Sequence, residues 1–115
     1  SMHERKLRMS ELADGFIAMP GGFGTLEELA EILTWVQLGL IQKPVGILNI
    51  EHFYDHLIAQ WDHMVDRELL RSQNRDLLIV DQNVVQLIDK MDRYQPSMVE
   101  KWISEKTQKD EPPRA

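Results

Sequence analysis

The ten residues from Met19 to Glu28 hold the side chains and backbone most able to do chemistry. They read Met-Pro-Gly-Gly-Phe-Gly-Thr-Leu-Glu-Glu, with three glycines among the four residues after the proline. Glycine lets the backbone turn sharply and brings its N–H groups close to a ligand. A helix that begins after such a turn adds the positive end of its dipole. The pattern predicts an anion site, in which a phosphate is held by Gly21, Gly22, Gly24 and Thr25.

A strand and a helix must hold this turn in place. Residues 15–19 are small or apolar and predict a short buried strand that ends at Pro20. Thr25 is expected to be the N-cap of the following helix, with Glu28 as its capping-box partner. A capping box and a tight turn also explain the segment without any ligand. It matches neither the dinucleotide fingerprint nor the P-loop, and the missing P-loop lysine argues against a nucleoside triphosphatase.

Helices alternate with short apolar strands along the chain, which predicts an α/β fold with a parallel sheet covered on both faces. After an N-terminal helix, the pattern predicts strands over 15–19, 44–50 and 77–80, and helices over 25–40, 52–67 and 83–93. The helix over 25–40 is expected to bury one apolar stripe. That stripe consists of Leu26, Leu29, Ala30, Leu33, Val36 and Leu40.

Two segments resemble the signatures of one enzyme family. Residues 20–28 resemble P-G-G-x-G-T-x-x-E, and Met2-His3-Glu4-Arg5-Lys6 resembles M-H-x-R-K. Both signatures belong to the LONELY GUY family, the cytokinin riboside 5′-monophosphate phosphoribohydrolases, many of which have been labelled lysine decarboxylases. The similarity continues through Thr34-Trp35 and residues 43–46.

The resemblance implies hydrolysis of the N-glycosidic bond of adenosine 5′-monophosphate, or of an N6-substituted form, to the free base and ribose 5-phosphate. It implies no metal and no organic cofactor, and it maps the family's catalytic pair onto Arg5 and Glu28. A carboxylate near an oxocarbenium-like ribosyl centre can stabilise positive charge or activate water. Arg5 offers a planar fork of donors to phosphate or ribosyl oxygens. The other expected substrate contacts are Lys6, Gly21, Gly22, Phe23, Gly24, Thr25, Glu27 and Thr34.

The resemblance also sets the expected domain organisation. The family's domain has a large N-terminal portion, so residues 1–103 are expected to be the C-terminal half of one Rossmann-like, doubly wound domain. Val99, Trp102 and Ile103 predict one more helix, and the polar residues 104–115 predict a disordered tail. A homodimer with a shared active site is expected, partly from the resemblance and partly from apolar helix faces.

Two other functions remain open. One is a non-catalytic module that binds a nucleotide or a cofactor, as in molybdenum-cofactor carriers. The other is a decarboxylase, which would need pyridoxal phosphate on a lysine and an acid facing the pyridinium nitrogen. No residue pattern marks that arrangement. His52, His56 and His63 are explained by a polar helix face more simply than by a metal site, and Glu31 is expected on a solvated face.

Composition narrows the classes of partner. The 115 residues carry 19 acidic and 13 basic side chains, for a net charge of −6. This acidic surface disfavours broad attachment to nucleic acid or to an anionic membrane. The chain has no cysteine, which excludes disulfides and thiolate chemistry. No apolar run is long enough to span a bilayer, and a cytoplasmic location is expected.

Overall fold

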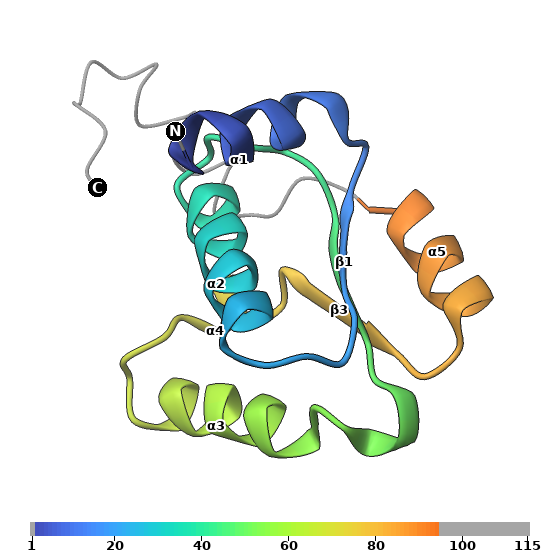
Figure 1. Ribbon diagram of the computed structural model, residues 1–115. Helices are drawn as coiled ribbons and strands as arrows, with labels where there is room; N and C mark the ends of the chain where they lie inside the picture. The colour runs from blue at the N-terminus through green and yellow to red at the C-terminus, as the bar shows by residue number, and fades with distance from the viewer. Residues whose placement is uncertain (1, 95–115) are drawn as a thin grey trace.

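Figure 1 shows the fold, a computed structural model that describes residues 2–94, with side chains from residue 4 onward. The helix predicted around Val99, Trp102 and Ile103 and the tail predicted over 104–115 lie outside the described residues. The elements are α1 (Met2–Leu12), β1 (Phe16–Ala18), α2 (Phe23–Gln37), β2 (Val45–Leu48), the 3-10 turn η1 (Ile50–His52), α3 (Asp55–Asp66), α4 (Ser72–Arg75), β3 (Leu78–Asp81) and α5 (Val84–Asp92). The predicted alternation of helices and strands is confirmed, with η1 and α4 as short additions.

The three strands form one parallel sheet in the order β1-β2-β3. Val45 of the central strand is in register with Phe16 of β1 and with Leu78 of β3. All four residues of β2 are buried, as expected for a central parallel strand covered on both faces. The predicted fold class, part of a Rossmann-like α/β domain, is confirmed.

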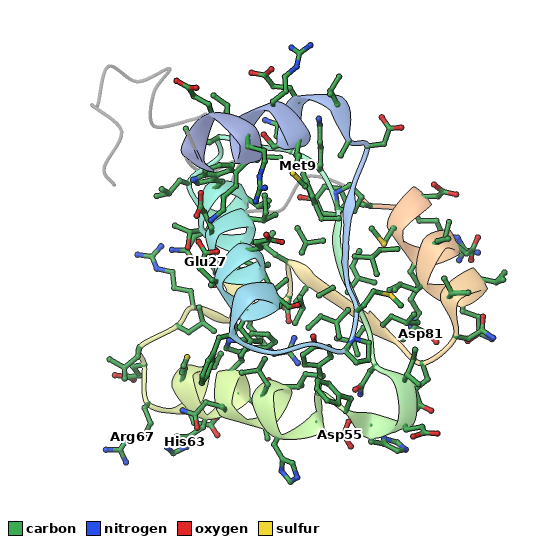
Figure 2. The ribbon with its side chains drawn as sticks, viewed as in Figure 1. Met9, Glu27, Asp55, His63, Arg67 and Asp81 are labelled. Atoms are coloured by element: carbon green, nitrogen blue, oxygen red, sulfur yellow. The ribbon has the colours of Figure 1, made fainter. Side chains whose placement is uncertain are left out.

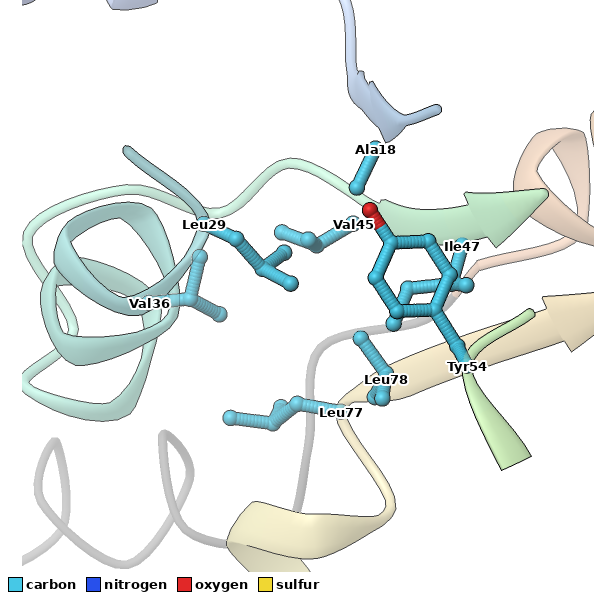
Figure 3. Close-up of a cluster of buried hydrophobic side chains, with 8 residues drawn as sticks. All are labelled: Ala18, Leu29, Val36, Val45, Ile47, Tyr54, Leu77 and Leu78. Carbon is cyan, nitrogen blue, oxygen red and sulfur yellow. The ribbon is translucent and has the colours of Figure 1, made fainter. Parts of the chain in front are cut away.

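Helices cover the two faces of the sheet unequally. Val45 and Ile47 point to the face packed against α2 and α3, where Leu29, Val36, Tyr54 and other residues complete the main core (Figure 3). On the other face, Leu48 packs with Leu87 and Met91 of α5. Figure 1 shows α2 and α5 on opposite sides of the strands. Among the described residues, no helix combines the length and apolar character needed to cross a membrane.

The buried stripe of α2 differs in part from its prediction. Leu29 and Val36 are buried, but Ala30 is exposed and Leu40 is 70% exposed. Leu40 lies beyond the helix, because α2 ends at Gln37 and Gly39 adopts a left-handed backbone with φ 77°. Ile32 packs against the core together with the two remaining stripe residues, Leu26 and Leu33.

The start of α2 corrects the capping prediction. The helix begins at Phe23 with Gly22 as its N-cap, and no side chain caps it. Its first hydrogen bond runs from the N–H of Leu26 to the carbonyl of Gly22, at 3.1 Å. Thr25 is therefore inside the first turn, where its side chain packs over Gly21. The prediction failed because glycine can itself serve as an N-cap.

Gly21 and Gly22 differ in the space around them, and this difference is testable. A Cβ at Gly21 would overlap the hydroxyl of Thr25 and lie 3.0 Å from its Cβ, whereas a Cβ at Gly22 meets nothing within 4 Å. Overpacking costs about 1–3 kcal/mol. We expect Gly21→Ala to lower the free energy of unfolding by about 1–2 kcal/mol and Gly22→Ala to change it far less. Denaturant unfolding measures both, and equal losses would contradict the packing difference.

The turn before α3 carries backbone strain. Glu51 and His52 adopt left-handed conformations, with φ 52° and 60°. A left-handed conformation costs a non-glycine residue about 1–2 kcal/mol, and glycine adopts it freely. His52 is exposed, and its ion pair with Asp55 (Nδ1 to Oδ2, 3.1 Å) lies at the surface, where such pairs contribute little.

We expect His52→Gly to raise the free energy of unfolding by about 0.5–1 kcal/mol, because the relief of strain exceeds the added chain entropy. His56→Gly is the matched control. His56 lies inside α3, where glycine costs about 1 kcal/mol. Thermal or denaturant unfolding should therefore show a higher free energy of unfolding for His52→Gly and a lower one for His56→Gly, although both replace histidine by glycine. A loss of stability in both variants would show that position 52 is not strained.

Candidate functional site

The turn between β1 and α2 exposes a group of backbone donors. Met19, Pro20, Gly21 and Gly22 are all exposed. Because the first intrahelical bond uses the N–H of Leu26, the N–H groups that precede it at the start of α2 have no acceptor within the helix. The helix dipole places partial positive charge at the same point. This arrangement can bind an anionic oxygen.

A cavity of about 460 Å³ lies between α1, β1 and α2, within the range of ~300–1,000 Å³ usual for small-molecule sites. Thr25 and Glu28 both line it, since residues three apart share one face of a helix. Within the described part of the chain, the carboxylate of Glu28 makes no hydrogen bond or ion pair, and it is exposed. The rest of the lining is mainly apolar, and includes Met9, Ala13, Phe16, Ala18, Leu29 and Ile32.

Lys6 joins α1 to α2 through two acids. Its side chain is buried, with 8% of its surface exposed. The ammonium donates to Glu27, and to Oε2 of Glu31 at 3.1 Å. The hydrogen bond to Glu27 raises the pKa of Lys6 above its ordinary value, so the lysine stays charged. Figure 2 shows Glu27 on α2, below the N-terminal part of α1.

Glu31 corrects an expectation. It was expected on a solvated face, but it is half-buried and lines the cavity beside Lys6. It turns inward because α1 packs across this part of α2 and brings a cation to it. Sequence spacing within α2 cannot show a contact that a second helix creates.

The structure brings some expected site residues together and separates others. Lys6, Thr25 and Glu28 line the same cavity, whereas Arg5 is exposed and does not line it. Neighbouring residues in a helix point about 100° apart, so Arg5 and Lys6 face different directions. Phe23 is 91% exposed at the start of α2.

Thr34 lies far from the turn. It is nine residues beyond Thr25, which corresponds to about 14 Å along the helix. Its hydroxyl donates to the carbonyl of Ala30 at 2.8 Å. It lines no part of the cavity between α1, β1 and α2. Its predicted contact with the ligand stays a prediction.

Sequence reasoning missed a second set of residues near the turn. Asn49 and Tyr54 are buried beside it, and the hydroxyl of Tyr54 donates to the carbonyl of Met19. The available signal was that a buried tyrosine hydroxyl usually has a hydrogen-bond partner.

The site joins the glycine-rich turn to an open carboxylate. The turn can hold a phosphate, and Glu28 can stabilise positive charge or accept a proton on a molecule held beside it. The described residues contain no group of three His, Asp or Glu side chains arranged to hold a metal ion.

Named relatives are similar to this chain over most of its length. Over 96 residues it is 46% identical to the cytokinin riboside 5′-monophosphate phosphoribohydrolase LOG2 of Arabidopsis thaliana, covering 84% of the chain and 45% of the relative. It is 42% identical over 99 residues to LOG7 of the same plant, covering 86% of the chain and 46% of the relative. It is 45% identical over 95 residues to LOG of Oryza sativa subsp. japonica, covering 83% of the chain and 39% of the relative. The chain thus spans somewhat less than half the length of these relatives.

The family-level comparison agrees with these pairwise similarities. The sequence profile of the family described as "Possible lysine decarboxylase" matches residues 1–91. That range contains both signature segments, the glycine-rich turn and the cavity. The chain therefore belongs to the family described as possible lysine decarboxylase, together with relatives named cytokinin riboside 5′-monophosphate phosphoribohydrolases.

Proposed function

We propose that this chain carries part of the active site of a nucleoside 5′-monophosphate phosphoribohydrolase. The substrate is adenosine 5′-monophosphate or an N6-substituted form of cytokinin type. Water adds to C1′ of the ribose, the bond from C1′ to the base breaks, and the free base leaves with a proton. The other product is ribose 5-phosphate. The names of the relatives and the two signature segments support this proposal.

One observation carries the proposal, namely that an open carboxylate and the two ends of the glycine-rich turn, Met19 and Thr25, line the same cavity. Thr25 belongs to the turn end of α2 and Glu28 follows three residues later, and both line the cavity. A phosphate held at the turn would place the attached ribose beside Glu28. A decarboxylase that uses pyridoxal phosphate needs a lysine free to bond the cofactor, whereas Lys6 is held by Glu27 and Glu31.

We assign the 5′-phosphate to the segment that holds Gly21, Gly22, Gly24 and Thr25. The N–H groups of Gly22, Gly24 and Thr25 are its proposed donors, because the N–H of Gly21 faces the hydroxyl of Tyr54. Glu28 stabilises the positive charge that develops on the ribosyl ring or activates the attacking water. Arg5 is assigned to phosphate or ribosyl oxygens, because a guanidinium donates in a planar fork. Its exposed position leaves it available to a ligand that extends beyond the cavity.

The remaining expected contacts receive supporting roles. Lys6 adds positive charge near the site, although its ammonium also binds Glu27 and Glu31. Glu27 and Thr34 are proposed contacts for ribose, base or a partner subunit. Phe23 is proposed to cover the bound nucleotide, since almost its whole side chain is exposed beside the turn.

Substitution of Glu28 tests the proposed reaction. With the intact protein, we expect Glu28→Gln to lower turnover of adenosine 5′-monophosphate by about 10²–10⁴-fold, because the amide cannot carry the negative charge. Affinity for the nucleotide should change only a few-fold. Chromatography of released adenine and of N6-isopentenyladenine from its monophosphate measures turnover.

Glu11→Gln is the control for the loss of one acidic charge. Glu11 is an exposed residue of α1 whose carboxylate pairs with Arg8 at the surface, at 3.7 Å. It should keep wild-type turnover. A wild-type protein that binds the monophosphate but releases no base would favour a non-catalytic binding module.

We also propose that the protein is a homodimer whose partner completes the active site. Large apolar side chains near the site support this, since Leu12 is 70% exposed on α1 and Phe23 is 91% exposed on α2. We expect light scattering at working concentration to give the mass of two chains. The mass of one chain would contradict the dimer.

A further inference from the structure

Tyr54 links the start of α3 to the glycine-rich turn. Its side chain is 2% exposed, and it is the last residue before α3. Its hydroxyl donates to the backbone carbonyl of Met19, 35 residues earlier in the chain. In Figure 3, the hydroxyl points toward β1 near Ala18. The ring of Phe53 packs edge-on against Tyr54, with 4.9 Å between ring centroids.

A buried asparagine fixes the backbone of Tyr54. Asn49, which follows β2, is 5% exposed, and its Oδ1 accepts the N–H of Tyr54 at 2.7 Å. Its Nδ2 donates to Oδ1 of Asp55 at 2.7 Å. Its own N–H donates to the carbonyl of Asp81 at the end of β3, at 2.8 Å. The ends of β2 and β3 therefore hold Tyr54 in place, and Figure 2 shows Asp55 below the turn at the start of α3.

The carbonyl of Met19 is an effective point at which to hold the turn. The peptide bond from Met19 to Pro20 is planar, and the proline ring fixes the next φ angle. Fixing the Met19 oxygen therefore leaves the ψ angle of Pro20 as the one soft dihedral before Gly21, and the N–H of Gly21 also faces the Tyr54 hydroxyl. Burial raises the pKa of the Tyr54 phenol, and the N–H of Gly21 opposes that shift. The hydroxyl thus remains protonated at neutral pH and able to donate to Met19.

We infer that Tyr54 is a positioning residue that holds the glycine-rich turn in its phosphate-binding conformation, an inference that rests on the proposed function. A glycine-rich turn has many backbone conformations to lose when it binds a ligand. A turn that is held in place beforehand loses fewer of them, so the ligand binds more tightly. Tyr54 acts through the backbone of Met19 and does not itself contact the nucleotide.

Tyr54→Phe tests the inference because it keeps the ring and removes only the hydroxyl. The substitution removes no packed carbon atom and costs one hydrogen bond, worth about 0.5–1.5 kcal/mol, so we expect the fold to persist. In the intact protein, the dissociation constants of adenosine 5′-monophosphate and inorganic phosphate should both rise about two- to tenfold. That of adenosine, which lacks the phosphate, should stay unchanged. Calorimetric titration and competition by inorganic phosphate measure these constants.

Tyr94→Phe is the matched control, since Tyr94 is the other tyrosine of the chain and follows α5. It should leave all three dissociation constants at wild-type values. Steady-state kinetics distinguish misfolding from a weakened phosphate site. An unfolded fraction lowers the apparent kcat, whereas a weakened phosphate site raises KM. A higher KM with nearly unchanged kcat is expected for Tyr54→Phe.

Two outcomes would overturn the inference. One is an unchanged dissociation constant for adenosine 5′-monophosphate in Tyr54→Phe. The other is an equal loss for adenosine and for its monophosphate, which would indicate a general packing role. A different result would contradict the proposed reaction, namely a wild-type protein that binds the monophosphate but releases no base. In that case the comparison of dissociation constants would still decide the role of Tyr54.

Discussion

Parallel pairing of the three strands is the constraint on which the rest of the structure depends. Because β1, β2 and β3 run in one direction, their carboxyl ends meet at one edge of the sheet, where ligands of open α/β sheets bind. The glycine-rich turn follows β1, Asn49 follows β2, and Asp81 ends β3 at this edge. The hydrogen bonds of Asn49 and Tyr54 connect all three strand ends. Strand direction thus places the glycine-rich turn beside Asn49 and Tyr54.

Two adjacent acids on α2 have different environments because a helix turns about 100° per residue. Glu27 meets the ammonium of Lys6 across the contact between α1 and α2. Glu28 lines the cavity without a partner among the described residues. The side chain of Lys6 is buried, and its ammonium pairs with both Glu27 and Glu31. Truncating Lys6 would therefore leave these two acids without their shared cation. One acid therefore serves the helix packing, and its neighbour stays available for chemistry.

The sequence predicted the order of elements and most strand positions, because apolar runs and glycines are local signals. It also singled out Thr25 and Glu28, and the structure places both in the lining of one cavity; their roles stay predictions. The prediction from sequence was wrong where backbone geometry decides which residue caps a helix, or where tertiary contacts decide which side chain is buried. Gly22 caps α2 in place of Thr25, and Glu31 turns inward because α1 supplies Lys6. The bond from Tyr54 to Met19 spans 35 residues, and no local pattern of either residue specifies it.

The position of β1 at the edge of the sheet links the fold to the open side of the cavity. Among the described residues, β1 pairs with β2 alone, and Ile17 of β1 remains exposed. Ile17 lines the cavity beside Glu28 and also a second hollow, of about 540 Å³, between β1 and α5. The unpaired edge of a strand can pair with another strand. In the relatives, more than half of the chain lies outside the part that matches this sequence. A strand added at β1 would cover Ile17 and complete the sheet at the edge from which the glycine-rich turn begins.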